Sequence, residues 1–172
     1  TNTNFVNSSG WPDDNHYSTV NDIAILSNAI IRDFPNLYTY FKMEEFTYND
    51  ITQPNRNKLL YQVQGADGLK TGFTKESGWG IAATALRNDR RITVVINGTN
   101  SSRSRLNESS NLINWAFNQT SQQTLVEKDQ FIKEVDVWLG SESSINLISA
   151  QKLVSTLSLS LIHISEPTRP SL

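Results

Sequence analysis

The sequence predicts a mixed α/β (α+β) fold, in which an antiparallel sheet with flanking helices precedes a smaller β-rich region. Residues 16–35 place apolar side chains at helical spacing between a polar start and a proline. The runs "WGIAATAL" and "RRITVVING" are separated by Asn88 and Asp89, which is typical of a hairpin of two strands. Residues 124–140 alternate apolar and polar side chains and show no helical spacing.

The first predicted helix has clear signals at both ends. Ser18 or Thr19 can cap its N-terminus, and Asp22 falls in the first turn, where a carboxylate suits the helix dipole. Pro35 is expected to end it. The residues expected to face the core are Val20, Ile23, Leu26 and Ile30, joined by Ala24 and Ile31.

Further elements follow in order. Residues 44–55 read as two short strands about a turn at Asn49 and Asp50. The two long apolar runs of the later hairpin are nearly continuous, which predicts strands covered on both faces by helices. An amphipathic helix is expected over residues 104–119. Its apolar side is assigned to Leu106, Ile113 and Phe117, with Leu112 and Ala116 beside them.

The pattern of apolar and polar residues changes after this helix. Val135, Val137 and Leu139 recur at period two, as in a strand. We therefore predict a domain boundary near residues 120–125, with one domain over residues 1–122 and the start of a β-rich domain over residues 123–158. Residues 159–169 read "LSLIHISEPTR", which resembles the translation of a transposon-type sequencing adapter, so residues 159–172 are not expected to be native. The alternative is an ordinary amphipathic C-terminus.

Composition excludes several classes of function. The chain has 172 residues, 37% of them hydrophobic and 19% charged, which fits a globular protein. Its net charge of -2 argues against a nucleic-acid partner. The absence of cysteine excludes disulfides and thiol catalysis. His16 and His163 lie far apart with no acidic metal-ligand spacing, so neither a metal, a cofactor nor a Ser/His/Asp triad is expected.

The stretch "DGLKTGFT" at residues 67–74 is the strongest chemical signal. A phosphate-binding loop requires glycine, lysine and serine or threonine in direct succession before a helix. Leu69 separates Gly68 from Lys70, and a strand follows the stretch, so this interpretation is rejected.

The stretch matches instead the Lys-Thr-Gly element of serine acyl-transfer enzymes of the penicillin-binding type. Lys70 supplies positive charge for an anionic substrate, and the hydroxyl of Thr71 can bind a substrate carboxylate. Gly72 permits close approach of an extended peptide to the strand edge, and the amide of Phe73 can donate to an oxyanion. A surface turn with an incidental lysine remains the alternative for the tripeptide alone.

The similarity extends well beyond the tripeptide. Residues 4–35, 45–61, 65–86 and 105–117 together resemble bacterial D-alanyl-D-alanine carboxypeptidases, which are low-molecular-mass penicillin-binding proteins and serine peptidases. The resemblance runs over about residues 3–139. It implies a partial β-lactamase/transpeptidase-like domain in residues 1–122, and a truncated β-rich domain after it.

The resemblance also implies roles for individual residues. It assigns substrate binding to Lys70, Thr71, Gly72 and the amide of Phe73, a position at which many relatives have histidine. Arg105 matches an arginine near the substrate carboxylate. Arg56 matches another arginine at the cleft, and a structural salt bridge is its alternative. A guanidinium can hold a carboxylate with two hydrogen bonds, which suits both arginines to this task.

No catalytic residue is expected in this chain. The family's Ser-x-x-Lys and Ser-x-Asn motifs are expected before residue 1, in a longer polypeptide that we call the intact protein, so the chain alone should be inactive. Three segments of this chain also spell Ser-x-Asn or Ser-x-x-Lys. They receive no catalytic role, because they follow Lys70, whereas in the family both motifs precede the Lys-Thr-Gly element. They lie at residues 109–111, 144–146 and 149–152.

The implied function is removal of the terminal D-Ala from peptidoglycan stem peptides through an acyl-enzyme. The implied partners are the stem peptide and β-lactam antibiotics. The implied location is the periplasm, with attachment to the inner membrane only through a C-terminal anchor absent from this chain. The alternatives are a D,D-endopeptidase, a β-lactamase-type serine acylase and a non-catalytic cell-wall binding protein.

Overall fold

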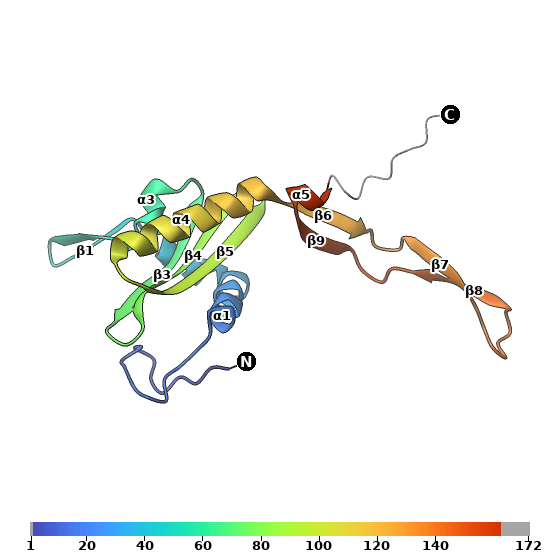
Figure 1. The fold of residues 1–172 in the computed structure, drawn as a ribbon, viewed down its shortest axis with the longest axis horizontal. Helices are drawn as coiled ribbons and strands as arrows, with labels where there is room; N and C mark the ends of the chain where they lie inside the picture. Colours follow the sequence, from blue (N-terminus) through green and yellow to red (C-terminus); the bar gives the residue numbers. More distant parts are fainter. Residues whose placement is uncertain (1, 163–172) are drawn as a thin grey trace. The chain divides into compact units, whose positions relative to one another are not determined.

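The computed structural model describes residues 2–162 and divides the chain into two compact units. The first unit is Thr1–Ala116 and the second is Phe117–Leu172 (Figure 1). The elements that begin in the first unit are α1 (Val20–Asp33), α2 (Pro35–Tyr38), the 3-10 helix η1 (Thr39–Lys42), β1 (Glu45–Tyr48), β2 (Ile51–Pro54), α3 (Leu59–Gln62), β3 (Ala66–Thr74), β4 (Gly78–Arg87), β5 (Arg90–Thr99) and α4 (Ser102–Gln119).

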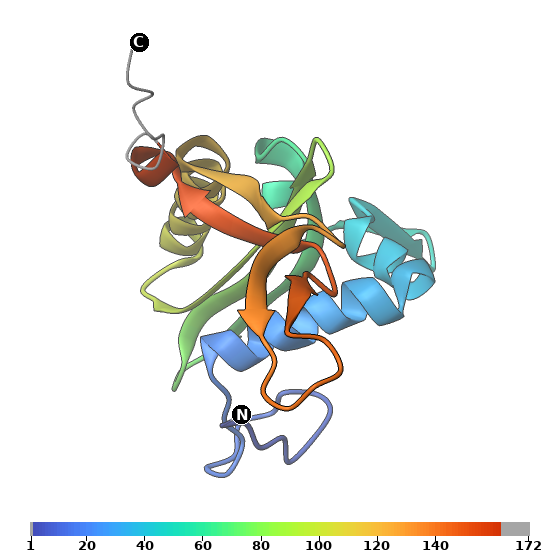
Figure 2. The same cartoon turned by 90° about the vertical axis from the view of Figure 1, so that its right-hand side faces the viewer.

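The main sheet has three antiparallel strands in the order β3-β4-β5. Helix α1 lies on one face of this sheet and α4 on the other (Figures 1 and 2). The mixed α/β class predicted from the sequence is confirmed. The sheet has one strand more than the predicted hairpin, because the stretch with Lys70 is itself a strand. Its two glycines resemble loop residues, yet the segment pairs with β4 over nearly its whole length, from Ala66 to Thr74.

Local signals in the sequence set the ends of α1. The side chain of Thr19 caps the helix by accepting a hydrogen bond from the backbone N–H of Asp22 at 3.0 Å. Pro35 ends α1 as expected, but it also occupies the first turn of α2, where the missing N–H costs nothing. The hydroxyl of Thr93 donates to Asn28 Oδ1 at 2.7 Å, which attaches α1 to β5.

The two predicted hairpin turns are present. Asn49 and Asp50 join β1 to β2, and Asn88 and Asp89 join β4 to β5. All four residues have positive φ, between 47° and 61°, which is the conformation that two-residue hairpin turns require. Asparagine and aspartate tolerate this conformation better than other non-glycine residues, which explains their occurrence here.

Helix α4 buries a narrower and more polar stripe than its apolar pattern predicts. Its buried residues are Arg105, Ser109 and Ile113, which recur every four positions on one side. Leu112 was expected beside the apolar side but is 45% exposed. A buried arginine in the first turn replaces the hydrophobic residue that an amphipathic helix would place there.

A charged cluster around Asp67 joins four elements at the start of β3. Arg91 of β5 donates two hydrogen bonds to the Asp67 carboxylate, from Nη1 to Oδ1 at 2.7 Å and from Nη2 to Oδ2 at 2.9 Å. Tyr38 of α2 and Thr84 of β4 each donate to Oδ1 at 2.8 Å. The Lys42 ammonium lies 3.8 Å from Oδ2. This geometry satisfies both carboxylate oxygens and fixes the main chain at residue 67.

The cluster shifts the pKa values of its members. Burial raises the pKa of the Asp67 carboxyl, but the hydrogen bonds from Arg91, Thr84 and Tyr38 outweigh burial and leave that pKa below its ordinary value of 3.8. Burial raises the pKa of Tyr38 to about 12. The hydrogen bond to Asp67 raises the pKa of the Arg91 guanidinium. The pair is therefore ionised at neutral pH, with Tyr38 as a neutral donor.

The second unit consists mainly of strands. β6 (Thr120–Val126) pairs with β9 (Leu153–Ser158), and β7 (Phe131–Asp136) pairs with β8 (Ser144–Ile148), both antiparallel. The predicted alternation was extended too far, because β7 ends at Asp136 and Leu139 lies in a turn with φ of 57°. The last described element is α5 (Leu159–Ile162), and residues 163–172 of the expected adapter segment lie outside the described residues.

Within residues 2–162, no helix combines the length and the apolar character that crossing a bilayer requires.

The Asp67 cluster predicts an acid-sensitive fold. Asp67→Asn in the intact protein should lower the free energy of unfolding at pH 7 by roughly 2–4 kcal/mol, since it leaves Arg91 without its partner in a mostly buried site. The folded-state pKa of Asp67 is depressed, so this contribution is complete well above 3.8 and disappears as pH falls below it. Urea unfolding between pH 7 and pH 3 measures both effects.

A matched control is Asp33→Asn, which removes the carboxylate of the exposed pair between Arg32 and Asp33. We expect this variant to leave the unfolding transition unchanged, because exposed pairs contribute little. The role assigned to the cluster would be contradicted if the two substitutions lowered the free energy of unfolding equally. It would also be contradicted if the difference in this free energy between wild type and Asp67→Asn were as large at pH 3 as at pH 7.

Candidate functional site

Strand β3 lies at the edge of the main sheet. Within the described part of the chain it pairs with β4 on one side and with no strand on the other. Lys70, Thr71, Gly72 and Phe73 all belong to this strand, so the structure brings these predicted site residues together on one edge. An open strand edge presents backbone N–H and C=O groups that can pair with an extended peptide.

The pleat of β3 divides its side chains between the two faces of the sheet. Lys70 pairs with Ala82 of β4, whereas Thr71 pairs with Ile81 and therefore belongs to the opposite face. Lys70 is exposed and Thr71 is buried. Both residues line the groove beside α1, and Thr71 also lines the small cavity beside Arg105 of α4.

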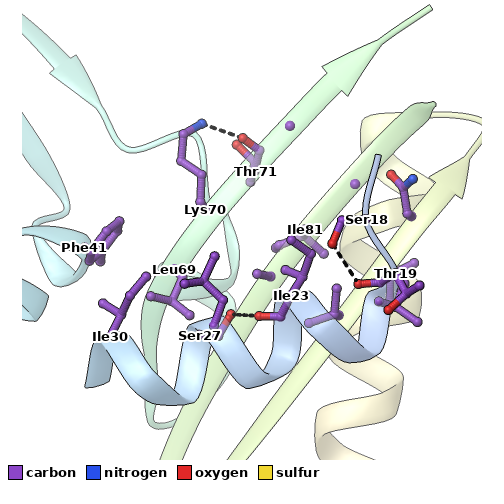
Figure 3. Close-up of a pocket in the computed structure, with 18 residues that line it drawn as sticks. Ser18, Thr19, Ile23, Ser27, Ile30, Phe41, Leu69, Lys70, Thr71 and Ile81 are labelled. Carbon is purple, nitrogen blue, oxygen red and sulfur yellow. Dashed lines mark hydrogen bonds between the residues drawn. The ribbon is translucent and has the colours of Figure 1, made fainter. Parts of the chain in front are cut away.

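A groove of about 440 Å³ runs between α1 and the sheet (Figure 3). Its lining is mostly apolar, with Ile23 and Ile30 of α1 and Leu69 of β3 among the labelled side chains. Lys70 is the only charged residue among those described as lining it. A single cation on an otherwise apolar wall favours an anionic group of a ligand or of another segment at that point.

The Lys70 ammonium has no acidic partner among residues 2–162. Its hydrogen bond goes to the carbonyl oxygen of Thr71 at 2.5 Å (Figure 3). Ser18 and Ser27 also line the groove, but Ser27 donates to the Ile23 carbonyl of its own helix, and neither serine bonds to Lys70. The lysine therefore remains available for a ligand.

Arg105 reaches β3 from the first turn of α4. It is 8% exposed, and its Nη1 lies 3.3 Å from the Gly72 oxygen and 3.5 Å from the Gly80 oxygen. These are long bonds to neutral acceptors, and no carboxylate among the described residues lies within ion-pair distance. Burial lowers the pKa of this guanidinium. A nearly buried cation without a counter-charge can accept an anionic ligand group.

The remaining predicted residues have different settings. The Phe73 ring is 53% exposed and packs on Trp79, with the ring centroids 4.4 Å apart. Arg56 is exposed, makes no ion pair among the described residues, and lines neither the groove nor the small cavity of about 20 Å³ beside Arg105. The next residue, Asn57, does line that cavity and donates to the Gly68 oxygen at 3.1 Å.

The serines set aside in the sequence have local partners. Ser109 is fully buried and donates to the Arg105 and Leu106 carbonyls of its own helix. Ser144 donates to Glu134, and Ser149 donates to the Gln151 carbonyl. The hydroxyl of Ser109 is therefore occupied within its own helix.

Sequence reasoning did not find Trp79 or Asp67. The Arg105 guanidinium lies over the Trp79 ring, 5.3 Å from its centre. Trp79 stands opposite Phe73 in the hairpin, so the pairing of β3 with β4 was the signal that could have identified it. Asp67 directly precedes Gly68, and a charged residue at the start of a buried strand was the available hint. Within residues 2–162, no cluster of three or more side chains suits a metal ion.

Comparison with known families gives a match over more than half of the chain. Residues 1–100 match the sequence model of the family Peptidase_S11, D-alanyl-D-alanine carboxypeptidase. D-alanyl-D-alanine carboxypeptidase DacC of Escherichia coli (strain K12) is 38% identical over 148 residues, which cover 86% of this chain and 37% of the relative. DacA of Haemophilus influenzae is 36% identical over 148 residues, covering 85% and 38%. The chain therefore spans well under half the length of these relatives.

Solved structures give the same result. Penicillin binding protein 5 from Haemophilus influenzae superposes with a TM-score of 0.80 at 34% identity, over 92% of this chain and 47% of that chain. Penicillin-binding protein D2 from Listeria monocytogenes, in its ampicillin-bound form, has a TM-score of 0.63 at 30% identity, over 67% and 49%. The resemblance and the fold class inferred from the sequence are confirmed.

The two glycines that flank Lys70 should respond differently to a methyl group. A Cβ at Gly68 would lie 2.7 Å from the buried Tyr38 hydroxyl, whereas a Cβ at Gly72 would meet nothing within 4 Å. Gly68→Ala should therefore destabilise the intact protein by about 1–3 kcal/mol through overpacking, and Gly72→Ala should leave the urea midpoint nearly unchanged. A stable Gly68→Ala variant would show that Tyr38 does not pack against β3 as described.

Proposed function

Because this chain belongs to the D-alanyl-D-alanine carboxypeptidase family Peptidase_S11, we propose that it forms the substrate-binding part of a serine enzyme that removes the terminal D-Ala from peptidoglycan stem peptides. The observation that carries the proposal is the open edge of β3, with Lys70 on one face of the sheet and Arg105 behind it on the other. Neither cation has an acidic partner among the described residues.

The peptide would bind as an added strand along β3. Gly72 has open space where a side chain would stand, so a peptide backbone can approach the strand closely there. Arg105 and the Thr71 hydroxyl would bind the terminal carboxylate, and the amide of Phe73 would donate to the oxyanion. Arg56 precedes Asn57, which lines the cavity beside Arg105, and its exposed guanidinium would contact a longer ligand.

The chemistry requires a nucleophile, which we place in a part of the intact protein outside residues 2–162. Its serine oxygen would attack the carbonyl between the two D-Ala residues, and the C–N bond would break as the departing amine takes a proton. Water would then hydrolyse the ester and release the enzyme. Lys70 would stabilise the charge that develops in both steps. The apolar groove beside Lys70 is a suitable surface for the segment that carries this serine.

Partners and location follow as proposals from the same assignment. The related protein D2 from Listeria monocytogenes has been solved in ampicillin-bound and cefotaxime-bound forms, which supports β-lactams as ligands that acylate the same serine. We propose that the intact protein works in the periplasm, which a stem-peptide substrate supports, and that a C-terminal anchor attaches it to the inner membrane. We also propose that residues 1–122 belong to the penicillin-binding domain and residues 123–158 begin a separate β-rich domain.

The proposal predicts the effect of removing the Lys70 charge. The intact protein should release D-Ala from a peptide ending in D-Ala-D-Ala, and Lys70→Ala should lower kcat/KM by roughly 10²–10³-fold because one stabilising charge is lost at the reacting centre. Lys133→Ala provides the control, since Lys133 is another exposed lysine that lies in β7 and lines neither the groove nor the small cavity beside Arg105. Undiminished release by Lys70→Ala would refute the assigned role.

A second experiment tests where the nucleophile lies. This 172-residue chain, incubated with a labelled penicillin, should form no covalent adduct, because no described serine bonds to Lys70. The intact protein should form one adduct per molecule. Mass spectrometry separates the outcomes, and a stoichiometric adduct on the chain alone would overturn the placement of the nucleophile outside it.

A further inference from the structure

The setting of Arg105 raises the question of what holds its charge in place. A nearly buried guanidinium in a folded protein is normally paired with a carboxylate. Arg105 has no such partner among residues 2–162, and its two backbone acceptors lie at 3.3 and 3.5 Å, at the long end of hydrogen bonding. A further contact must contribute to its orientation.

That contact is the ring of Trp79. The Cζ atom of Arg105 lies 5.3 Å from the ring centre, within the range in which a cation is attracted to an aromatic face. The ring is itself held in place. Its cross-strand partner Phe73 packs on it at 4.4 Å, and its backbone oxygen accepts a hydrogen bond from the buried Thr99 hydroxyl at 3.0 Å.

An aromatic ring and a carboxylate can both hold an arginine side chain in place, but they differ in how much of its positive charge they leave for a ligand. A carboxylate partner would cancel the positive charge and occupy the planar edge of the guanidinium. The quadrupole of an aromatic ring attracts the cation but carries no net charge, so the field of the arginine persists. Arg105 is therefore fixed in position while its charge remains available to an anionic ligand group at the β3 edge.

We propose that Trp79 is a positioning residue that holds the Arg105 charge for a terminal carboxylate and so makes the site prefer peptides with a free C-terminus. The inference rests on the proposed function. It deepens that function by identifying a determinant of specificity, because recognition of a free carboxylate distinguishes a peptide with a free terminal acid from one whose terminus is blocked.

The test uses the intact protein and two peptides with the same sequence ending in D-Ala-D-Ala, one as the free acid and one as the C-terminal amide. The wild type should prefer the acid. Trp79→Leu should lower kcat/KM for the acid by roughly 3–30-fold, mainly through KM, and should leave the amide nearly unchanged. Trp79→Phe keeps an aromatic face and should restore most of the preference.

The control is Trp115→Leu, because Trp115 lies on the same helix as Arg105 but ten positions further along it, and is exposed. It should leave the ratio of acid to amide cleavage unchanged. Equal losses for both peptides in Trp79→Leu, or an unchanged ratio, would overturn the role of Trp79 while leaving the proposed function intact. A wild type that cleaves neither peptide between its two D-Ala residues would overturn the proposed function and this inference together.

Discussion

The carboxylate of Asp67 is the constraint on which the rest of the first unit depends. It accepts hydrogen bonds from Tyr38, Thr84 and Arg91, which belong to a helix and two strands, and it lies near Lys42. A buried carboxylate with fewer donors would be costly, and here both of its oxygens accept hydrogen bonds. Because Asp67 is the second residue of β3, the cluster sets the position from which the strand runs toward Lys70 and Thr71.

The site differs from this cluster in its electrostatics. Around Asp67, charges are paired and their pKa values are shifted toward the ionised forms. At the edge of β3, Lys70 and Arg105 have no acidic partner among the described residues and contact only backbone oxygens and an aromatic ring. The ion pair of Asp67 and Arg91 therefore lies at the start of the strand whose edge carries the unpaired cations. An anionic ligand would supply the counter-charge that Lys70 and Arg105 lack.

Local signals made much of the fold predictable. The cap at Thr19 and the positive-φ pairs at both hairpin turns follow from single residues and their neighbours. Two features did not follow from local signals. The stretch around Lys70 has loop-like glycines, and its assignment to a strand edge came from the Lys-Thr-Gly motif; the structure pairs it with β4. Trp79 reaches Arg105 only after β4 and α4 pack together, and no sequence pattern encodes that contact. The Lys-Thr-Gly element identified the residues at the strand edge. The residues that hold them in place, Asp67 and Trp79, were identified only from the tertiary structure.

The most direct test of the account is a crystal structure of the intact protein, with its nucleophilic serine replaced by alanine, in complex with a peptide ending in D-Ala-D-Ala. The account predicts an extended peptide hydrogen-bonded along the free edge of β3, with its terminal carboxylate about 3 Å from Arg105. A peptide bound elsewhere, with the edge of β3 unoccupied and Arg105 without an anionic partner, would contradict it.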